Sequence, residues 1–271
     1  MKKILLVLTA LLTVSALYSQ VASDIRYAPR RQEVAQAGGS SDRLLDVYLP
    51  ETKAPRKGYP VVLFVHGGGF KNGDKCPNAV YMGLLERGYA VVSINYYLSL
   101  AGNKEMSART QMQGVPPAGH FHPDMDRAIS LASEDALLAL KWLGRHAREY
   151  GLDKRRIAVC GGSAGAMTVL NLAYTRRPKR PRIRAVVNLW GSLADPSAIG
   201  PKDPPVMTLH GDQDDLVSVE FAYAIRDRVR QLGREDCPVV IMTGRGHAQY
   251  KYVAASEELM DQIAAFLAAT L

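Results

Sequence analysis

The sequence predicts a single α/β domain, built as a doubly wound and mostly parallel sheet with helices on both faces. Six short apolar runs are typical of strands buried on both faces; they occupy 60–65, 89–96, 156–161, 183–190, 204–210 and 237–242. Helical patterns lie near 77–87, 134–149, 164–175, 218–232 and 256–270. Strands that alternate with helices imply right-handed crossovers and a parallel sheet. A chain of 271 residues suffices for one large domain with a substantial core.

The first residues have the pattern of a secretory signal peptide. Lys2 and Lys3 precede an apolar run from Ile4 to about Leu17, which is short for a membrane span. Cleavage after Ser19 or Ala22 fits small-residue processing. We therefore expect a signal peptide over 1–22, an α/β domain over 23–271, and an exported, periplasmic or secreted protein with no membrane span in the mature chain. The alternative is an uncleaved anchor or a buried first helix.

Two segments depart from the regular alternation. Residues 43–50 alternate apolar and polar side chains, which predicts an antiparallel strand at the sheet edge. Residues 98–125 have no clear period and follow a predicted strand, so they leave from its carboxyl end. Ligands of open α/β sheets bind outside those ends. We therefore expect 98–125 to form a pocket-lining loop.

Charge and cysteine content exclude some functions. The net charge is +8, and much of the excess lies at 176–184. Such a run can bind nucleic acid, but it lacks interleaved aromatic residues and contains two prolines, which favours a solvated loop. Cys76 and Cys237 are the only cysteine pair that merits consideration as a disulfide, since Cys160 lies in an apolar strand. His120, His122 and Asp124 have a spacing that metal ligands can show, but no further cluster of ligand residues accompanies them. No metal or other cofactor is therefore expected.

A strand, a sharp turn and a helix surround Ser163 in "RIAVCGGSAGAM". In this context a G-x-S-x-G match predicts a nucleophilic serine, because the small residues allow a strained turn and a closely packed helix. The alternative is that these residues serve only close packing of a helix against the sheet.

The other groups that acyl transfer requires follow in order. "VHGGGF" at 65–70 comes directly after a buried strand, and its amides, with the N–H of Ala164 at the helix start, could stabilise an oxyanion. A phosphate-binding loop is disfavoured, because the P-loop lysine is missing. "LHGDQDDLV" offers Asp212, Asp214 and Asp215 as acids, and "MTGRGHAQY" offers His247 as a base, each after a later strand.

These motifs resemble those of the α/β-hydrolase superfamily, and within it the serine esterases with an H-G-G-G loop, over roughly 41–271. The resemblance implies that Ser163 is the nucleophile, Asp214 the acid and His247 the base. It also implies an oxyanion hole formed by Gly68, Gly69 and Ala164. The chain departs from that group in having Gly162 before the serine, where an acidic residue is common, and in lacking a large cap domain.

Aromatic residues near these motifs are the candidate substrate-binding side chains. They are Phe70, Tyr96 and Tyr97, and of the two tyrosines we expect one to line the pocket and the other to lie in the core. His66 and His210 are expected to orient their loops rather than act as bases.

The sequence thus predicts an exported serine esterase that acts through an acyl-enzyme intermediate. Its expected substrates are short or aromatic acyl esters, including acetyl or feruloyl groups on polysaccharides, because similar capless esterases remove such groups. A serine exopeptidase and a non-catalytic hydrolase-like binding protein are the alternatives. Neither nucleic acid nor a membrane is expected as a partner, and the oligomeric state is left open.

Overall fold

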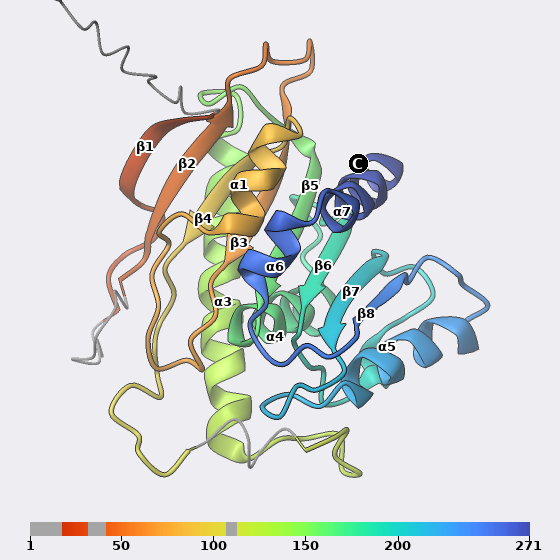
Figure 1. Cartoon of the computed structure of the whole chain (residues 1–271). Coiled ribbons are helices and arrows are strands. Elements are labelled where there is room, and N and C mark those ends of the chain that lie inside the picture. The colour runs from red at the N-terminus through yellow and green to blue at the C-terminus, as the bar shows by residue number, and fades with distance from the viewer. Residues whose placement is uncertain (1–17, 32–41, 107–112) are drawn as a thin grey trace, which may run out of the picture.

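The computed structural model describes residues 18–31, 42–106 and 113–271. Its centre is one eight-stranded sheet with the order β1-β2-β4-β3-β5-β6-β7-β8 (Figure 1). The strands are β1 (Tyr18–Arg26), β2 (Leu44–Pro50), β3 (Tyr59–Val65), β4 (Ala90–Ile94), β5 (Leu152–Gly162), β6 (Ala185–Leu189), β7 (Val206–Gly211) and β8 (Val239–Met242).

Strands β3 to β8 run parallel to one another, and β1 and β2 form an antiparallel edge. Tyr48 of β2 pairs with Val91 of β4, whereas Val62 of β3 pairs with the same Val91 in parallel. The predicted mostly parallel, doubly wound sheet is confirmed, and so is the antiparallel edge strand at 43–50.

Helices cover both faces of the sheet (Figure 1). One face carries α1 (Ala79–Glu86), α6 (Tyr250–Ala255) and α7 (Glu257–Thr270). The other carries α3 (Pro123–His146), α4 (Ala164–Asn171), the π-helix η1 (Leu172–Arg176), the 3₁₀ turn η2 (Pro196–Ala198) and α5 (Glu220–Gln231). No helix among the described residues is both long enough and apolar enough to span a bilayer.

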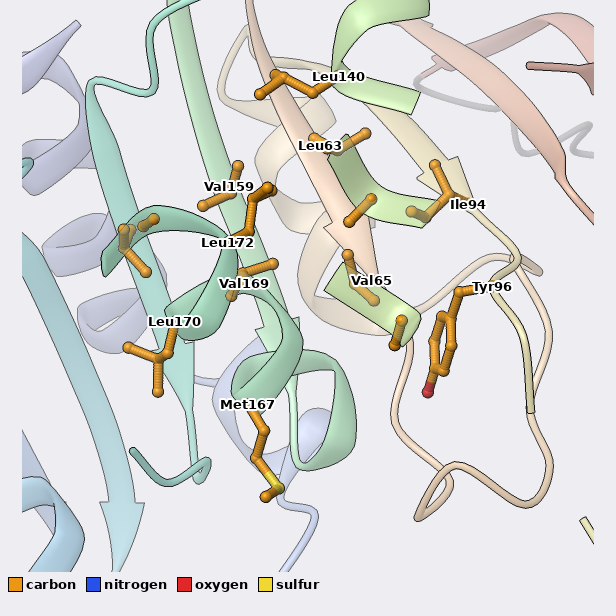
Figure 2. Close-up of a cluster of buried hydrophobic side chains, with 14 of the residues drawn as sticks. Leu63, Val65, Ile94, Tyr96, Leu140, Val159, Met167, Val169, Leu170 and Leu172 are labelled. Atoms are coloured by element: carbon orange, nitrogen blue, oxygen red, sulfur yellow. The ribbon is translucent and has the colours of Figure 1, made fainter. Parts of the chain in front are cut away.

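The core has two halves because successive strand residues point to opposite faces. In β3, Leu63 and Val65 pack with α3 and α4, whereas Phe64 packs with α1. Figure 2 shows the first half, where side chains of the sheet meet Leu140 of α3 and Val169 of α4. This burial on both faces explains why the strands appear in the sequence as continuous apolar runs.

Helix α3 begins at Pro123, well before the predicted helix at 134–149. Its start signals are local: the His122 side chain accepts a hydrogen bond from the N–H of Asp124, and Asp124 and Asp126 lie in the first turn. Proline is well tolerated there, because the first-turn N–H groups have no intrahelical acceptor. The helix thus takes the last three residues of the segment expected to be a loop.

The three cysteines are free, so the Cys76–Cys237 pair considered from the sequence is not formed. Cys76 lies beyond the carboxyl end of β3, before α1. Cys237 comes just before β8, at the amino end of that strand. The two thiols therefore lie at opposite ends of the sheet.

The predicted signal peptide falls mostly on residues 1–17, outside the described part of the chain. Its two candidate cleavage points lie within β1, where Gln20 pairs with Tyr48 and Ala22 with Val47.

Candidate active site

Ser163 occupies a sharp turn between β5 and α4. The strand ends at Gly162, the helix begins at Ala164, and Ser163 between them has φ 55° and ψ −122°. A positive φ is strained for a residue with a side chain, and here the surroundings hold it in place. The N–H of Ser163 donates to the carbonyl of Leu189 in β6 at 2.9 Å, and the Ser163 carbonyl accepts from Met167 at 3.0 Å.

The small residues of the motif allow α4 to lie directly against the sheet. A Cβ atom at Gly165 would overlap the carbonyl oxygen of Val65, the last residue of β3. The first turn of α4 therefore touches the strand that leads into the H-G-G-G loop. This contact places the serine turn and the glycine loop side by side.

His247 and Asp214 converge on Ser163 from two other strands. Nε2 of His247 lies 2.8 Å from Oγ of Ser163, and Nδ1 lies 2.6 Å from Oδ2 of Asp214. The serine follows β5, the aspartate follows β7 and the histidine follows β8, so all three lie beyond carboxyl ends of one sheet. A base between a hydroxyl and a carboxylate, at hydrogen-bond distance from both, is the arrangement of a catalytic triad.

The side chain of Asp214 is fully buried, and its carboxylate is held by several donors. Oδ1 accepts from the backbone N–H groups of Leu216 at 2.9 Å and Val217 at 2.8 Å, while Nε2 of His210 lies 3.3 Å from Oδ2. Burial by itself would raise the pKa of this carboxyl. The hydrogen bonds from His210, His247 and Val217 outweigh it and hold the pKa of Asp214 well below its ordinary value.

The two neighbouring aspartates differ from Asp214 in exposure. Oδ1 of Asp212 accepts from the N–H of Gly244 at 2.7 Å, which ties together the loops after β7 and β8. Asp212 and Asp215 are both exposed. Of the three candidates, Asp214 is the one whose buried carboxylate lies 2.6 Å from Nδ1 of His247, as the resemblance implies.

The glycine loop borders the same cavity as the serine and the histidine. Gly68 and Gly69 line a cavity of about 590 Å³ together with Ser163 and His247. The carbonyl of Gly68 accepts from the N–H groups of Lys71 at 3.0 Å and Asn72 at 3.2 Å, which closes the loop into a tight turn. Ala164 opens α4, so its N–H has no intrahelical acceptor. Backbone N–H groups of the glycine loop and of the start of α4 thus lie close to the serine.

His66 and His210 support loops, as expected. Nδ1 of His66 lies 2.7 Å from the carbonyl oxygen of Gly67, and its ring stacks on that of Tyr96. Burial lowers the pKa of His66, which keeps the imidazole neutral. Nε2 of His210 lies 2.8 Å from the carbonyl oxygen of Val217 and so braces the turn that presents Asp214.

Tyr250 is a cavity residue that the sequence analysis did not single out. It is the first residue of α6, it lines the cavity beside Ser163, and its ring meets Trp190 edge to face with centroids 4.8 Å apart. A Cβ atom at Gly162 would overlap the Tyr250 hydroxyl. Tyr250 therefore occupies the space that a side chain would need at this position, where an acidic residue is common in the group that the sequence resembles. Burial raises the pKa of Tyr250, so it remains a neutral phenol.

The three aromatic residues expected to bind substrate lie elsewhere. Phe70 and Tyr96 are fully buried, and their rings pack edge to face. The Tyr96 hydroxyl donates to the carbonyl of His66 at 3.0 Å, so this side chain supports the glycine loop from beneath. Tyr97 is half-buried under the guanidinium of Arg31, 5.3 Å from the ring centroid. Among the described residues, none of the three lines the cavity beside Ser163.

The described residues of 98–125 also lie away from that cavity. After β4 the chain packs behind the glycine loop: Leu98 and Leu100 are buried, and the N–H of Leu100 donates to the carbonyl of Phe70 at 3.0 Å. Gly119, His120 and Phe121 instead line a separate cavity of about 320 Å³. Residues 107–112 lie outside the described part of the chain.

The thiol of Cys76 also borders the serine cavity, but its surroundings do not favour the nucleophilic thiolate. Cys76 lines it, and its thiol donates to Oδ1 of Asp74 at 3.1 Å. This hydrogen bond, together with partial burial, raises the pKa of Cys76 and disfavours the thiolate. Ser163 is thus the cavity nucleophile that has a base beside it.

Two family models match consecutive parts of the chain. The model described as BD-FAE matches residues 45–115, and the model described as alpha/beta hydrolase fold matches residues 126–229. The first match includes the glycine loop and the second includes Ser163 and Asp214.

Curated relatives match about half of the chain. The chain is 30% identical to acetylcholinesterase 1 of Caenorhabditis briggsae, with 59% of this chain and 23% of that protein covered. It is 31% identical to fumonisin B1 esterase of Sphingopyxis macrogoltabida, with 55% and 27% covered. The match therefore spans about a quarter of the length of these relatives.

Solved structures share the fold over nearly the whole chain. A truncated carbohydrate esterase from gut microbiota superposes with a TM-score of 0.66 at 15% identity, covering 94% of this chain and 98% of that one. Esterase 2 of Thermogutta terrifontis superposes with a TM-score of 0.58 at 18% identity, covering 83% and 89%.

The sheet order, the serine turn and the structural neighbours together show an α/β-hydrolase fold, and the match to the model described as alpha/beta hydrolase fold agrees with it. The matched relatives and structural neighbours of the chain include carboxylesterases and carbohydrate esterases. The resemblance found in the sequence is confirmed.

Proposed function

We propose that this protein is a serine carboxylic-ester hydrolase that acts through an acyl-enzyme intermediate. The observation that carries the proposal is the chain of two contacts from Ser163 through His247 to Asp214, at 2.8 and 2.6 Å. Esterases among the matched relatives and structural neighbours support it.

The geometry assigns a role in ester hydrolysis to each of these groups. Oγ of Ser163 attacks the ester carbonyl carbon while its proton passes to Nε2 of His247. Asp214 accepts from Nδ1 and stabilises the imidazolium. The oxyanion receives hydrogen bonds from the loop amides of Gly68 and Gly69 and from the N–H of Ala164. His247 then protonates the departing alcohol, and a water activated by the same base releases the acid.

Labelling and turnover test the proposal together. A fluorophosphonate probe should add one phosphonyl group to Ser163, identified by mass spectrometry of the digested protein. The protein should hydrolyse p-nitrophenyl acetate and leave dipeptide p-nitroanilides intact. Faster cleavage of the dipeptide amides would favour the exopeptidase alternative. Absence of both labelling and turnover would favour a non-catalytic binding protein.

We propose short or aromatic acyl groups on sugars as the substrate class. Polar side chains continue the cavity beyond the glycine loop, where Asn72, Asp74 and Asn78 line it. Amide and carboxylate groups suit the hydroxyls of a sugar alcohol and do not suit a lipid interface, which would require an exposed apolar patch. The carbohydrate esterase among the structural neighbours supports this choice.

Acid release from three esters tests the substrate class. Acetyl-xylan and methyl ferulate should be hydrolysed, and emulsified triolein should be hydrolysed much more slowly. Fastest release from triolein would contradict the proposal and indicate a lipase.

We also propose that the protein is exported, on the basis of Lys2, Lys3 and the apolar run that follows. Cleavage after Ser19 is the better of the two positions, because cleavage after Ala22 would remove the residues of β1 that pair with β2 at Tyr48 and Val47. N-terminal sequencing of the secreted protein distinguishes them, and a start at Met1 would contradict export by cleavage.

A further inference from the structure

A basic hollow lies at the end of the sheet opposite to Ser163. It measures about 720 Å³ and lies between the C-terminal end of α3 and the amino ends of β5 and β6. We define it by its exposed cations, which come from three segments. The loop before β6 contributes Lys179, Arg180, Arg182 and Arg184.

The facing wall is also basic. The start of β5 contributes Lys154 and Arg155, and the end of α3 contributes Lys141 and Arg145. None of the described residues that line the hollow is acidic. Eight cations around one concavity create a strongly positive potential, because each one adds to the field of the others.

These cations lack the ion pairs that neighbouring cations make. Arg156, next to Arg155, lies 2.9 Å from Asp153, and Arg177, just before the loop, lies 3.0 Å from Asp203. Arg176 donates to the carbonyl of Ser130 at 2.9 Å. Within the described part of the chain, none of the eight hollow cations has a carboxylate within 4.0 Å. A solvated loop alone does not account for cations that are gathered from three segments and left unpaired.

The loop is a fixed wall rather than a loose tether. Ile183 is buried between Arg182 and Arg184, and the N–H of Arg184 donates to the carbonyl of Ile157 at 2.8 Å. Pro181 packs against α3, where a Cβ atom at Gly144 would come within 3.0 Å of its ring. The cations are therefore presented in a set arrangement, which reduces the entropy that a ligand must remove on binding.

We infer that this hollow binds the carboxylate groups of an acidic polysaccharide. Five of the eight cations are arginines, whose planar guanidinium groups match carboxylates in pairs of hydrogen bonds. The lining has no aromatic side chain on which nucleic acid bases could stack. Binding to a membrane surface would require exposed apolar side chains beside the hollow. Among the described residues, the large exposed apolar side chains are Val21 and Tyr252, and neither lines the hollow. The choice of a polysaccharide over other polycarboxylates rests on the proposed function, whereas the anion site itself does not.

The position of the hollow suits a second, non-catalytic hold on a polymer. Arg155 and Ser163 lie eight residues apart on one strand and turn, which corresponds to about 26 Å. A polymer held in the hollow therefore leaves the serine cavity free. Such a hold would raise the local concentration of ester groups without touching the reacting atoms.

Binding to the inactive variant Ser163→Ala tests the site independently of turnover. Calorimetric titration with polygalacturonate should show binding that weakens as NaCl rises, and neutral dextran should show none. A variant with Lys179, Arg180, Arg182 and Arg184 changed to Gln should bind polygalacturonate at least ten-fold more weakly. The matched control changes four exposed cations elsewhere, Lys53, Lys104, Lys202 and Arg230, to Gln and should bind as before.

The outcomes separate this inference from the proposed function. Equal weakening in the control variant would overturn the site, because it would show a response to net charge alone. Equal or tighter binding of single-stranded DNA, or of vesicles containing phosphatidylglycerol, would overturn the assignment to an acidic polysaccharide. Failure of ester hydrolysis would leave the binding result unaffected, and loss of binding with intact hydrolysis would overturn only the inference.

Discussion

The two ends of the sheet differ in whether their charged side chains have hydrogen-bond or ion-pair partners. At the carboxyl ends each side chain of the Ser163, His247 and Asp214 triad has a defined partner: Asp214 is held by His210, His247 and two backbone N–H groups, and His247 contacts the serine and the aspartate at once. At the amino ends the cations of the basic hollow are exposed and without ion pairs among the described residues. The serine site would work through hydrogen bonds at fixed, short distances. The basic hollow would work through the summed electrostatic field of its cations.

This contrast predicts how each end responds to substitution. A hydrogen-bonded, buried site fails when one atom is changed, because the remaining partners are left unsatisfied. A cluster of exposed cations loses its effect gradually, since each one contributes a fraction of the field. The following expectations test the contrast from the largest effect to the smallest.

Ser163→Ala should have the largest effect. Removal of Oγ eliminates the nucleophile, so kcat on p-nitrophenyl acetate should fall by on the order of 10⁴-fold or more. The fold should persist, because alanine can take the same backbone conformation with the same neighbours. Steady-state kinetics and the Tm check both parts. A variant that retains a tenth of wild-type turnover would refute the assignment of Ser163.

Asp214→Asn should be next, with a loss on the order of 10³- to 10⁴-fold in kcat, because an amide cannot stabilise the imidazolium of His247. Asp212→Asn and Asp215→Asn serve as controls and should change kcat less than about three-fold. Comparison of the three variants in one assay decides the register. Greater damage from Asp215→Asn would move the acid by one position.

The low pKa of Asp214 has a consequence for pH dependence. The pKa of this carboxyl is lower in the folded state than in the unfolded state, so its contribution to stability is present above about pH 4 and is lost as pH falls further. Asp214 should therefore stay ionised on mild acidification, and its contribution to the free energy of unfolding, followed by denaturant unfolding at a series of pH values, should be retained down to about pH 4. A pH profile of Asp212→Asn should match that of the wild type.

Gly162→Ala should have a moderate effect that depends on Tyr250. The added methyl group overlaps the Tyr250 hydroxyl, and overpacking of this kind costs about 1–3 kcal/mol in the free energy of unfolding. In a Tyr250→Ala background the same change should cost much less. Denaturant unfolding of the four proteins gives this double-mutant cycle. An equal cost in both backgrounds would show that Tyr250 does not exclude the side chain.

The smallest effect belongs to the basic hollow. Replacing Lys179, Arg180, Arg182 and Arg184 with Gln should change kcat/KM on a small neutral ester less than about two-fold, because the hollow lies several Debye lengths of about 8 Å from Ser163. The same should hold for a small anionic ester at physiological salt. A ten-fold fall on either ester would show that the two ends are coupled.

The sequence predicted the strands well because burial on both faces leaves an unbroken apolar run. The six predicted runs correspond to β3 to β8, and Ser163, Asp214 and His247 follow three of them. Local signals were less reliable. The segment 98–125 was expected to be a loop, although its last three residues form the first turn of α3, and the short helix α6 was not predicted.

Contacts between distant segments could not be predicted from one sequence. The departure at Gly162 is visible in the motif, but the residue that explains it, Tyr250, follows β8 and meets Gly162 only through the order of the strands. Likewise, nothing local distinguishes the paired Arg177 from the unpaired Arg180, because Asp203 reaches the former through the fold. The aromatic residues Phe70 and Tyr96 were placed near the right loop, but their side chains face the core.

The order in which the strands meet also fixes when the protein becomes active during its synthesis. The serine turn and the glycine loop are complete once β5 and α4 exist, yet the base arrives with the connection after β8, 84 residues beyond Ser163. Chains are made from the amino end, so a shorter nascent chain carries a nucleophile with nothing to remove its proton. The proposed activity therefore requires synthesis of the chain as far as His247. On the proposed mechanism, a chain that ends before His247 has no base beside Ser163, whatever part of its sheet has already formed.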